Sequence, residues 1–259
     1  GGVVLVHMSG LITPEIVEIE NFCKDNNLFL LTDDAHAYGA SYYDTYGGEV
    51  RCAGSFGDAG VFSFYPSKII TTAEGGMITT NNNELAEKCR VVRNHGTRRN
   101  NGEHQGLDYG YTCDMPSTNY RMSEFHAVLG IHQNKHLNNF LVRRNEITDI
   151  YNERLKNTKW LQTPLVDDAI YQSWWQYIVK ITDGRDRTKI LLQLLNDYNI
   201  PTANAYQPLC HQQKIYGNFL SRYGFKKSEN FITKIFSLPV YVELDDEQVN
   251  YICDCIEKL

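Results

Sequence analysis

A serine, a lysine and a pair of glycines follow one another directly after an apolar run, Ala59 to Phe64. The segment reads Ser63-Phe64-Tyr65-Pro66-Ser67-Lys68 and leads to Glu74-Gly75-Gly76. A lysine that is partly removed from water has a lowered pKa and can form a Schiff base with a carbonyl cofactor. A serine hydroxyl just before it, together with nearby backbone N–H groups, can bind an anionic group. The segment therefore predicts a site for a cofactor that carries both a carbonyl and an anion.

A second polar group, Thr32-Asp33-Asp34-Ala35-His36-Ala37, ends another apolar run. Because strand side chains alternate, we expect Asp33 and Ala35 to point the same way. The carboxylate of Asp33 can pair with a protonated pyridine nitrogen, and the small Ala35 lets a flat ring lie against the strand end. His36 can reach a ring hydroxyl. Lys68 and Asp33 together are the pair that pyridoxal phosphate chemistry requires.

Each of these residues also has an ordinary structural explanation. Lys68 taken alone is a solvated surface group, Asp33 or Asp34 can cap the next element, His36 is a loop histidine, and Ser63 can bond to its local backbone. What favours a binding site is that Asp33, His36, Ser63 and Lys68 all lie at or just past the carboxyl ends of predicted strands. Ligands of open α/β sheets bind at that edge.

The elements that must position these residues alternate between strand and helix. We expect a helix from Pro14 to Asn26 with Thr13 as its N-cap, and another from Asn83 to Arg93. The expected strands are Val3 to His7, Leu28 to Thr32, Ala59 to Phe64 and Gly76 to Thr80. This alternation predicts an α/β fold with a mostly parallel sheet whose two faces are covered.

The pattern changes in the second half of the chain. Residues 121 to 156 are strongly helical with a break near Lys135, and later segments predict a strand at 175–181 and helices at 187–199 and 246–258. We therefore predict two domains: a partial cofactor-binding large domain over residues 1–135, and connecting helices with a small α/β domain over residues 136–259. Residues 94–119 form a long polar loop, for which function and disorder are competing explanations.

Composition excludes several other classes of function. The formal net charge of −6 does not favour a nucleic-acid partner. No stretch has the length and apolarity of a membrane-spanning helix, and none has the pattern of a signal peptide. The seven cysteines include no pair at the spacing of a zinc site. We expect reduced thiols and no metal in a cytoplasmic protein that binds neither nucleic acid nor membrane.

Several spaced motifs in one order resemble the DegT/StrS-type sugar aminotransferases, which are fold-type-I pyridoxal phosphate enzymes. The resemblance runs over nearly the whole chain. Besides the two segments above, it rests on Val6-His7-Met8-Ser9-Gly10, Arg93-Asn94-His95-Gly96, Asn119-Tyr120-Arg121-Met122 and Leu238-Pro239.

The resemblance implies a role for each candidate residue. Lys68 would carry the Schiff base to pyridoxal 5'-phosphate, Asp33 would hold the pyridine nitrogen, and His36 would lie near the ring hydroxyl. Ser63 would bind the cofactor phosphate. Asn119 would reach a phosphate across the interface of a homodimer, and His95 would lie near the sugar substrate.

The chain departs from the family at three points. Thr32 stands where the family usually has Glu, and Asp34 where it usually has Ala. Asp34 therefore competes with Asp33 for the pyridine nitrogen, although the spacing to His36 favours Asp33. The family's N-terminal segment, with a further phosphate-binding turn and an aromatic residue stacked on the ring, is missing, and Gly1-Gly2 leads straight into an apolar run. We therefore expect a fragment.

The resulting hypothesis is transamination of a nucleotide-linked keto sugar, with glutamate as the amino donor, in polysaccharide biosynthesis. A sugar dehydratase on the same scaffold is a second enzyme hypothesis. Lys68 argues against it because the family's dehydratases carry histidine at the Schiff-base position. The alternative from another class is a truncated or non-catalytic remnant that binds a ligand or partner without turnover.

Overall fold

The computed structural model describes residues 1–44, 48–98, 112–113, 115–203, 206–216 and 224–259, which form two compact units. Unit 1 comprises Gly1–Asn138 and Asp168–Ser173, and unit 2 comprises Asn139–Asp167 and Trp174–Leu259. The predicted domain boundary after residue 135 stays a prediction.

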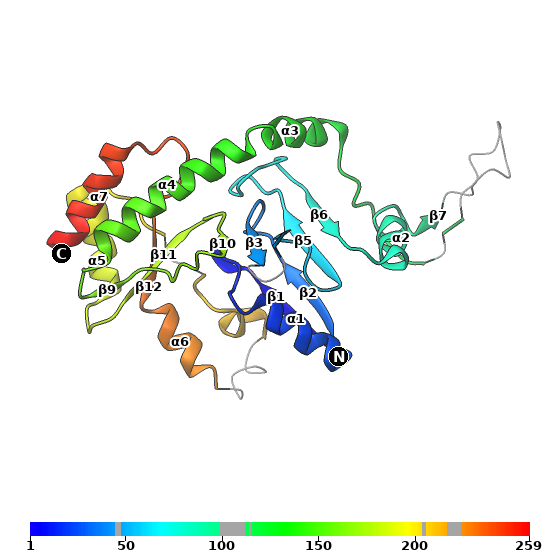
Figure 1. Cartoon of the computed structure of the whole chain (residues 1–259), viewed down its shortest axis with the longest axis horizontal. Helices are drawn as coiled ribbons and strands as arrows, with labels where there is room; N and C mark the ends of the chain where they lie inside the picture. Colours follow the sequence, from blue (N-terminus) through cyan, green and yellow to red (C-terminus); the bar gives the residue numbers. More distant parts are fainter. Residues whose placement is uncertain (45–47, 99–111, 114, 204–205, 217–223) are drawn as a thin grey trace. The chain divides into compact units, whose positions relative to one another are not determined.

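The main sheet of unit 1 has the strand order β1 (Gly2–Val6), β2 (Phe29–Asp33), β5 (Ala59–Ser63) and β6 (Gly76–Thr79). Strands β1, β2 and β5 are parallel, and β6 pairs antiparallel with β5 (Figure 1). The α/β fold class with a mostly parallel sheet is thus confirmed. Asp33 lies in register between Val6 and Val61, so the carboxyl ends of the three parallel strands meet at one edge.

Helix α1 (Ile16–Asp25) buries Ile16, Glu20 and Cys23, whose spacing is that of one helix face. It begins two residues after the predicted start, with Glu15 rather than Thr13 at the N-cap. The reason is local, because the Thr13 hydroxyl bonds to the Glu15 carboxylate and caps no backbone N–H.

A small second sheet completes unit 1, and the sequence did not predict it. Its strand order is β10 (Ile170–Tyr171), β3 (Ser41–Asp44) and β4 (Glu49–Cys52), all antiparallel. Next to β10, the side chain of Gln172 accepts a hydrogen bond from Ile12 N and donates one to Ile12 O. The segment at residues 168–173 is thereby fastened to the start of the chain.

Two further helices of unit 1 begin at residues whose side chains cap them. Asn82 caps α2 (Asn83–Val92), and Ser123 caps α3 (Glu124–Asn134). Strands β7 (Thr97–Arg98) and β8 (Thr112–Cys113) pair antiparallel, and a 3-10 turn spans Met8–Gly10. The predicted break near Lys135 is confirmed, because α3 ends at Asn134 and α4 (Leu137–Leu155) begins just after it.

Unit 2 is built on a three-stranded antiparallel sheet in the order β12 (Ile235–Leu238), β11 (Tyr177–Ile181) and β9 (Leu161–Gln162). Its helices are most of α4, together with α5 (Arg187–Tyr198), α6 (Lys226–Ile232) and α7 (Asp246–Lys258), and 3-10 turns span Cys210–Gln212 and Lys214–Tyr216. The buried Tyr151 and Tyr177 donate their hydroxyls to Pro239 O and Asn152 Oδ1. No helix within the described ranges is long and apolar enough to cross a membrane.

Candidate active site

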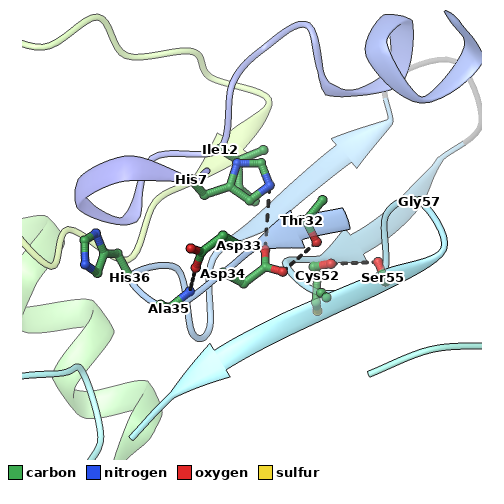
Figure 2. Close-up of polar contacts among 12 residues, drawn as sticks. His7, Ile12, Thr32, Asp33, Asp34, Ala35, His36, Cys52, Ser55 and Gly57 are labelled. Atoms are coloured by element: carbon green, nitrogen blue, oxygen red, sulfur yellow. Dashed lines mark hydrogen bonds and ion pairs between the residues drawn. The ribbon is translucent and has the colours of Figure 1, made fainter. Parts of the chain in front are cut away.

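The carboxyl ends of β2 and β5 bring Asp33 and Ser63 to the same edge of the sheet, because each is the last residue of its strand. Beyond Asp33 the chain turns back, and the backbone N–H of Ala35 donates to Asp33 Oδ1 at 3.1 Å (Figure 2). The carbonyl of Asp33 accepts from His7 N at 3.0 Å. The Asp33 side chain is half-buried, so its carboxylate is fixed by the turn and still reachable.

Lys68 lies in a loop that is closed by hydrogen bonds at both ends. The backbone N–H of Lys68 donates to Tyr65 O at 3.0 Å. Further along, Thr72 N and the Thr71 hydroxyl both donate to Phe64 O, at 3.0 and 3.1 Å. These bonds fix the backbone that carries Lys68 immediately after β5.

The side chain of Lys68 is half-buried, and its environment suits a nucleophile. Burial lowers the pKa of the Lys68 ammonium group, and the charge of Asp33 partly opposes this shift. A lowered pKa increases the fraction of neutral amine, which is the form that attacks a carbonyl.

His36 lies within electrostatic reach of both Asp33 and Lys68. Burial lowers the pKa of His36 to about 4, the charge of Lys68 lowers it further, and Asp33 raises it. The backbone N–H of Ser9 donates to His36 Nδ1 at 3.2 Å, so the neutral ring carries its proton on Nε2. The structure therefore brings Asp33, His36 and Lys68 together.

Ser63 and Ala35 complete this edge of the sheet. The Ser63 oxygen accepts a hydrogen bond from Tyr65 N at 3.3 Å, which leaves its hydroxyl hydrogen to donate. Ala35 is half-buried and projects only a methyl group.

His95 and Asn119 lie in a different part of unit 1. His95 is exposed between α2 and β7, which Figure 1 shows beyond β6, away from β1 and β2. Asn94 and Asn119 form an antiparallel bridge, and Asn119 Oδ1 accepts from Arg121 N at 3.1 Å. The structure thus groups His95 with Asn119, because the bridge between Asn94 and Asn119 brings their two segments together. Residues 99–111 and 114 of the predicted polar loop lie outside the described residues.

Asp34, the competitor of Asp33 in the sequence, is completely buried. Its carboxylate accepts a hydrogen bond from the Thr32 hydroxyl at 2.6 Å and faces the ring of His7 (Figure 2). A fully buried carboxylate cannot meet a ligand at the half-exposed edge, which favours Asp33 for that role. Sequence reasoning assigned no role to His7, although it ends the first predicted strand and belongs to the motif Val6-His7-Met8-Ser9-Gly10.

This set of residues fits pyridoxal phosphate. Asp33 provides a carboxylate for the ring nitrogen, Lys68 an amine for the carbonyl, and Ser63 a hydroxyl for the phosphate. Asp33 and Ser63 end neighbouring parallel strands, and Lys68 and His36 both lie within electrostatic reach of Asp33. Among the residues that the structure describes, no three His, Cys, Asp or Glu side chains are arranged to hold a metal ion.

Comparison with known proteins gives concordant results. A model of the DegT/DnrJ/EryC1/StrS aminotransferase family matches residues 1–257. The spore coat polysaccharide biosynthesis protein SpsC of Bacillus subtilis is 31% identical, over 99% of this chain and 66% of its own length. A GDP-perosamine synthase of Escherichia coli O157:H7 is 28% identical, over 94% and 62%.

Among solved structures, the aminotransferase PseC of Helicobacter pylori, involved in the biosynthesis of pseudoaminic acid, superposes with a TM-score of 0.85 at 28% identity. The match covers 98% of this chain and 65% of PseC. The chain thus spans slightly less than two thirds of the length of these relatives.

Proposed function

The chain belongs to the DegT/DnrJ/EryC1/StrS aminotransferase family, and on that premise we propose that it serves pyridoxal-phosphate-dependent transamination of a nucleotide-linked keto sugar. The observation that carries the proposal is that Asp33 and Ser63 end the neighbouring parallel strands β2 and β5, with Lys68 in the loop directly after β5 and within electrostatic reach of Asp33. The GDP-perosamine synthase among the relatives supports a nucleotide sugar as substrate, and SpsC supports a place in polysaccharide biosynthesis. Glutamate is the amino donor that we propose.

When bound, pyridoxal phosphate supplies a protonated ring that withdraws electrons from the reacting carbon. Asp33 keeps that ring protonated, because a carboxylate beside the ring nitrogen favours the cationic form. Its bond from Ala35 N and its place at the end of β2 hold the carboxylate in position.

Lys68 is the proposed catalytic residue. Its Nζ would hold the cofactor carbonyl, and once free it would accept and return a proton at the reacting carbon as general base and general acid. The lowered pKa of Lys68 favours the neutral amine, which is the form that attacks a carbonyl and accepts a proton.

His36 and Ser63 orient the cofactor in this proposal. His36 would offer Nε2–H to the ring hydroxyl, because Nδ1 accepts from Ser9 N. The Ser63 hydroxyl donates to the phosphate, and Ala35 leaves room for the ring. We further propose a cytoplasmic homodimer in which Asn119 reaches the phosphate of the partner's site and His95 lies near the sugar.

The first test is spectroscopic. Pyridoxal phosphate added to the purified protein should give a visible absorption band that bleaches when glutamate is added. Lys68→Ala should abolish the band and reduce turnover by about 10²- to 10⁴-fold, the usual contribution of general acid–base catalysis. The matched control is Lys88→Ala, an exposed lysine of α2 that should leave the band unchanged.

A normal band or normal turnover in Lys68→Ala would overturn the assignment. A band in the unaltered protein that does not bleach with glutamate would instead favour the non-catalytic alternative, in which the chain binds a ligand without turnover.

A further inference from the structure

A buried polar group adjoins Asp33 at the ends of the paired strands β1 and β2. It consists of His7, Asp34 and Thr32, and Figure 2 shows the first two with their side chains facing each other. His7 is 1% exposed and Asp34 is 0% exposed. His7 Nε2 lies 3.6 Å from Asp34 Oδ1, and Thr32 Oγ1 donates to Asp34 Oδ2 at 2.6 Å.

The space for the Asp34 carboxylate depends on two glycines. A Cβ on Gly60 would lie 2.7 Å from Asp34 Oδ2 and 2.5 Å from the Cα of Gly54. Gly54 itself has a φ of +82°, a backbone conformation that side-chain-bearing residues rarely adopt. The local backbone therefore accommodates this carboxylate closely.

Several polar atoms of this group and of the neighbouring Ser9 lack a hydrogen bond within the described part of the chain. They are both ring nitrogens of His7, Oδ1 of Asp34 and the hydroxyl of Ser9. A buried polar atom without a partner costs about 1–3 kcal/mol. Such atoms beside a candidate active site therefore call for a functional explanation.

The charge states of Asp34 and His7 support a functional explanation. Burial raises the pKa of Asp34 to about 6, and the neighbouring charge of Asp33 raises it too, against the bonds from Thr32 and Gly54 N. Burial lowers the pKa of His7 to about 4, so His7 is neutral while Asp34 changes its charge. Asp33 acts electrostatically on both residues, and His36 and Lys68 in turn interact with Asp33.

We infer that Asp34, with His7 facing it, is a positioning residue for Asp33. The ionised form of Asp34 strengthens the hold of Asp33 on the cofactor's ring nitrogen. The inference rests on the proposed function for the identity of the cofactor. Ionised Asp34 adds a second negative charge beside Asp33, and this charge favours a protonated ring. When Asp34 is protonated, this second negative charge is absent. The pKa of the ring nitrogen is therefore lower when Asp34 is protonated than when it is ionised.

The link between the two carboxyl groups can be tested without cofactor. Carbon-13 NMR of aspartate-labelled protein should show one carboxyl resonance, lost in Asp34→Asn, that titrates near pH 6. In Asp33→Asn its midpoint should fall, because a like charge has been removed. Asp25→Asn, an exposed carboxylate at the end of α1, is the control that should leave it unchanged.

A titration of Asp34 near the ordinary value of about 4, or a midpoint that does not respond to Asp33→Asn, would overturn the inference. So would an equal response to Asp25→Asn.

The effect on the cofactor needs the loaded protein. Its visible absorption should show a transition near pH 6 that disappears in Asp34→Asn and in Asp34→Ala, while Asp25→Asn retains it. A transition that persists without Asp34 would overturn the inference. Absence of any cofactor band in the unaltered protein would count against the proposed function instead, and the titration without cofactor would still decide whether Asp34 is linked to Asp33.

Discussion

Two adjacent aspartates at the end of β2 have opposite environments, and this difference gives them different chemistry. Asp33 is half-buried at the edge where ligands bind, whereas Asp34 is fully buried with Thr32 as its hydrogen-bond donor. In the sequence, the spacing to His36 favoured Asp33 over Asp34 for the site. That spacing did not predict the partner His7, because the contact between His7 and Asp34 depends on the parallel pairing of β1 with β2.

At the same scale, Ser63 offers a direct test of phosphate binding. Ser63→Ala removes one hydroxyl donor to a charged group, a contribution of about 1.5–3 kcal/mol. We expect the dissociation constant for pyridoxal phosphate to rise roughly 10- to 100-fold. The expected midpoint of urea unfolding is unchanged, since Ser63 Oγ only accepts a local bond from Tyr65 N.

Fluorescence titration with the cofactor measures this effect, and Ser228→Ala, an exposed serine of α6, is the matched control. Equal affinities for Ser63→Ala and the unaltered protein would remove Ser63 from the site.

At the scale of elements, the sequence predicted those whose signals are local. Helices α2, α5 and α7 lie within one residue of their predicted bounds, because each begins at an Asn or Asp cap. The strands β3, β4 and β10 were missed because they are only two to four residues long and because β10 pairs with a strand far away in the sequence. The same distinction between local signals and distant pairing applies to the candidate site. Asp33 and Lys68 were predicted as site residues from their places at strand ends, whereas no role was predicted for His7.

The loop that carries Lys68 should be sensitive at Gly75. A Cβ there would lie 2.3 Å from Thr72 Oγ1 and 2.7 Å from the terminal methyl of Met122. Gly75→Ala should therefore displace the Thr72 hydroxyl from Glu74 O and lower the free energy of unfolding by about 1–3 kcal/mol, the usual cost of overpacking.

Chemical denaturation measures this cost, and cofactor absorption shows whether Lys68 has moved with the loop. Gly184→Ala, which meets no atom within 4 Å, is the control. A fully stable Gly75→Ala variant with normal cofactor binding would show that the loop tolerates the methyl group.

A buried ion pair fastens α1 to β4 and should make unit 1 sensitive to acid. Arg51 donates to both carboxylate oxygens of Glu20, at 2.9 and 3.0 Å, and Gly57 N donates to Oε1 at 2.8 Å. These bonds, chiefly those from Arg51, lower the pKa of Glu20 to about 2. Since this lies below the unfolded value of about 4.3, the stabilisation is complete above that value and is lost as the pH falls toward 2.

Arg51→Met should lower the free energy of unfolding at pH 7 by up to about 3 kcal/mol, because the buried Glu20 carboxylate loses both bonds from Arg51 and keeps the exposed Lys24 as its cation. It should also flatten the decline in stability between pH 4 and 2. Urea unfolding at several pH values measures both effects. Arg90→Met, which breaks an exposed pair with Glu87, should cost less than about 1 kcal/mol. Equal losses in the two variants would contradict this account.

At the scale of the whole molecule, the proposed homodimer has sites shared between two copies of the chain. If Asn119 completes the partner's site, Lys68→Ala and Asn119→Ala proteins should complement each other when mixed. Half of the dimers would then be mixed, and each would contain one intact site, so roughly a quarter of the original activity should return.

Turnover after denaturation and renaturation of the two variants together measures this return, with each variant treated alone as the control. A mixture no more active than its components would place Asn119 outside the partner's site, and a strictly monomeric protein in light scattering would leave Asn119 without its proposed role.

The segment at residues 168–173 has a consequence for how the protein is made. Strand β10 covers the outer edge of β3, and the Ser173 hydroxyl donates to His36 O at 2.9 Å, so unit 1 is complete only when this segment arrives. At about 5–20 residues per second, a ribosome needs on the order of ten seconds to travel from β3 to β10. During that interval the nascent chain carries an open strand edge that can pair with a neighbouring chain. Slow translation between these strands should therefore favour aggregation of the nascent protein.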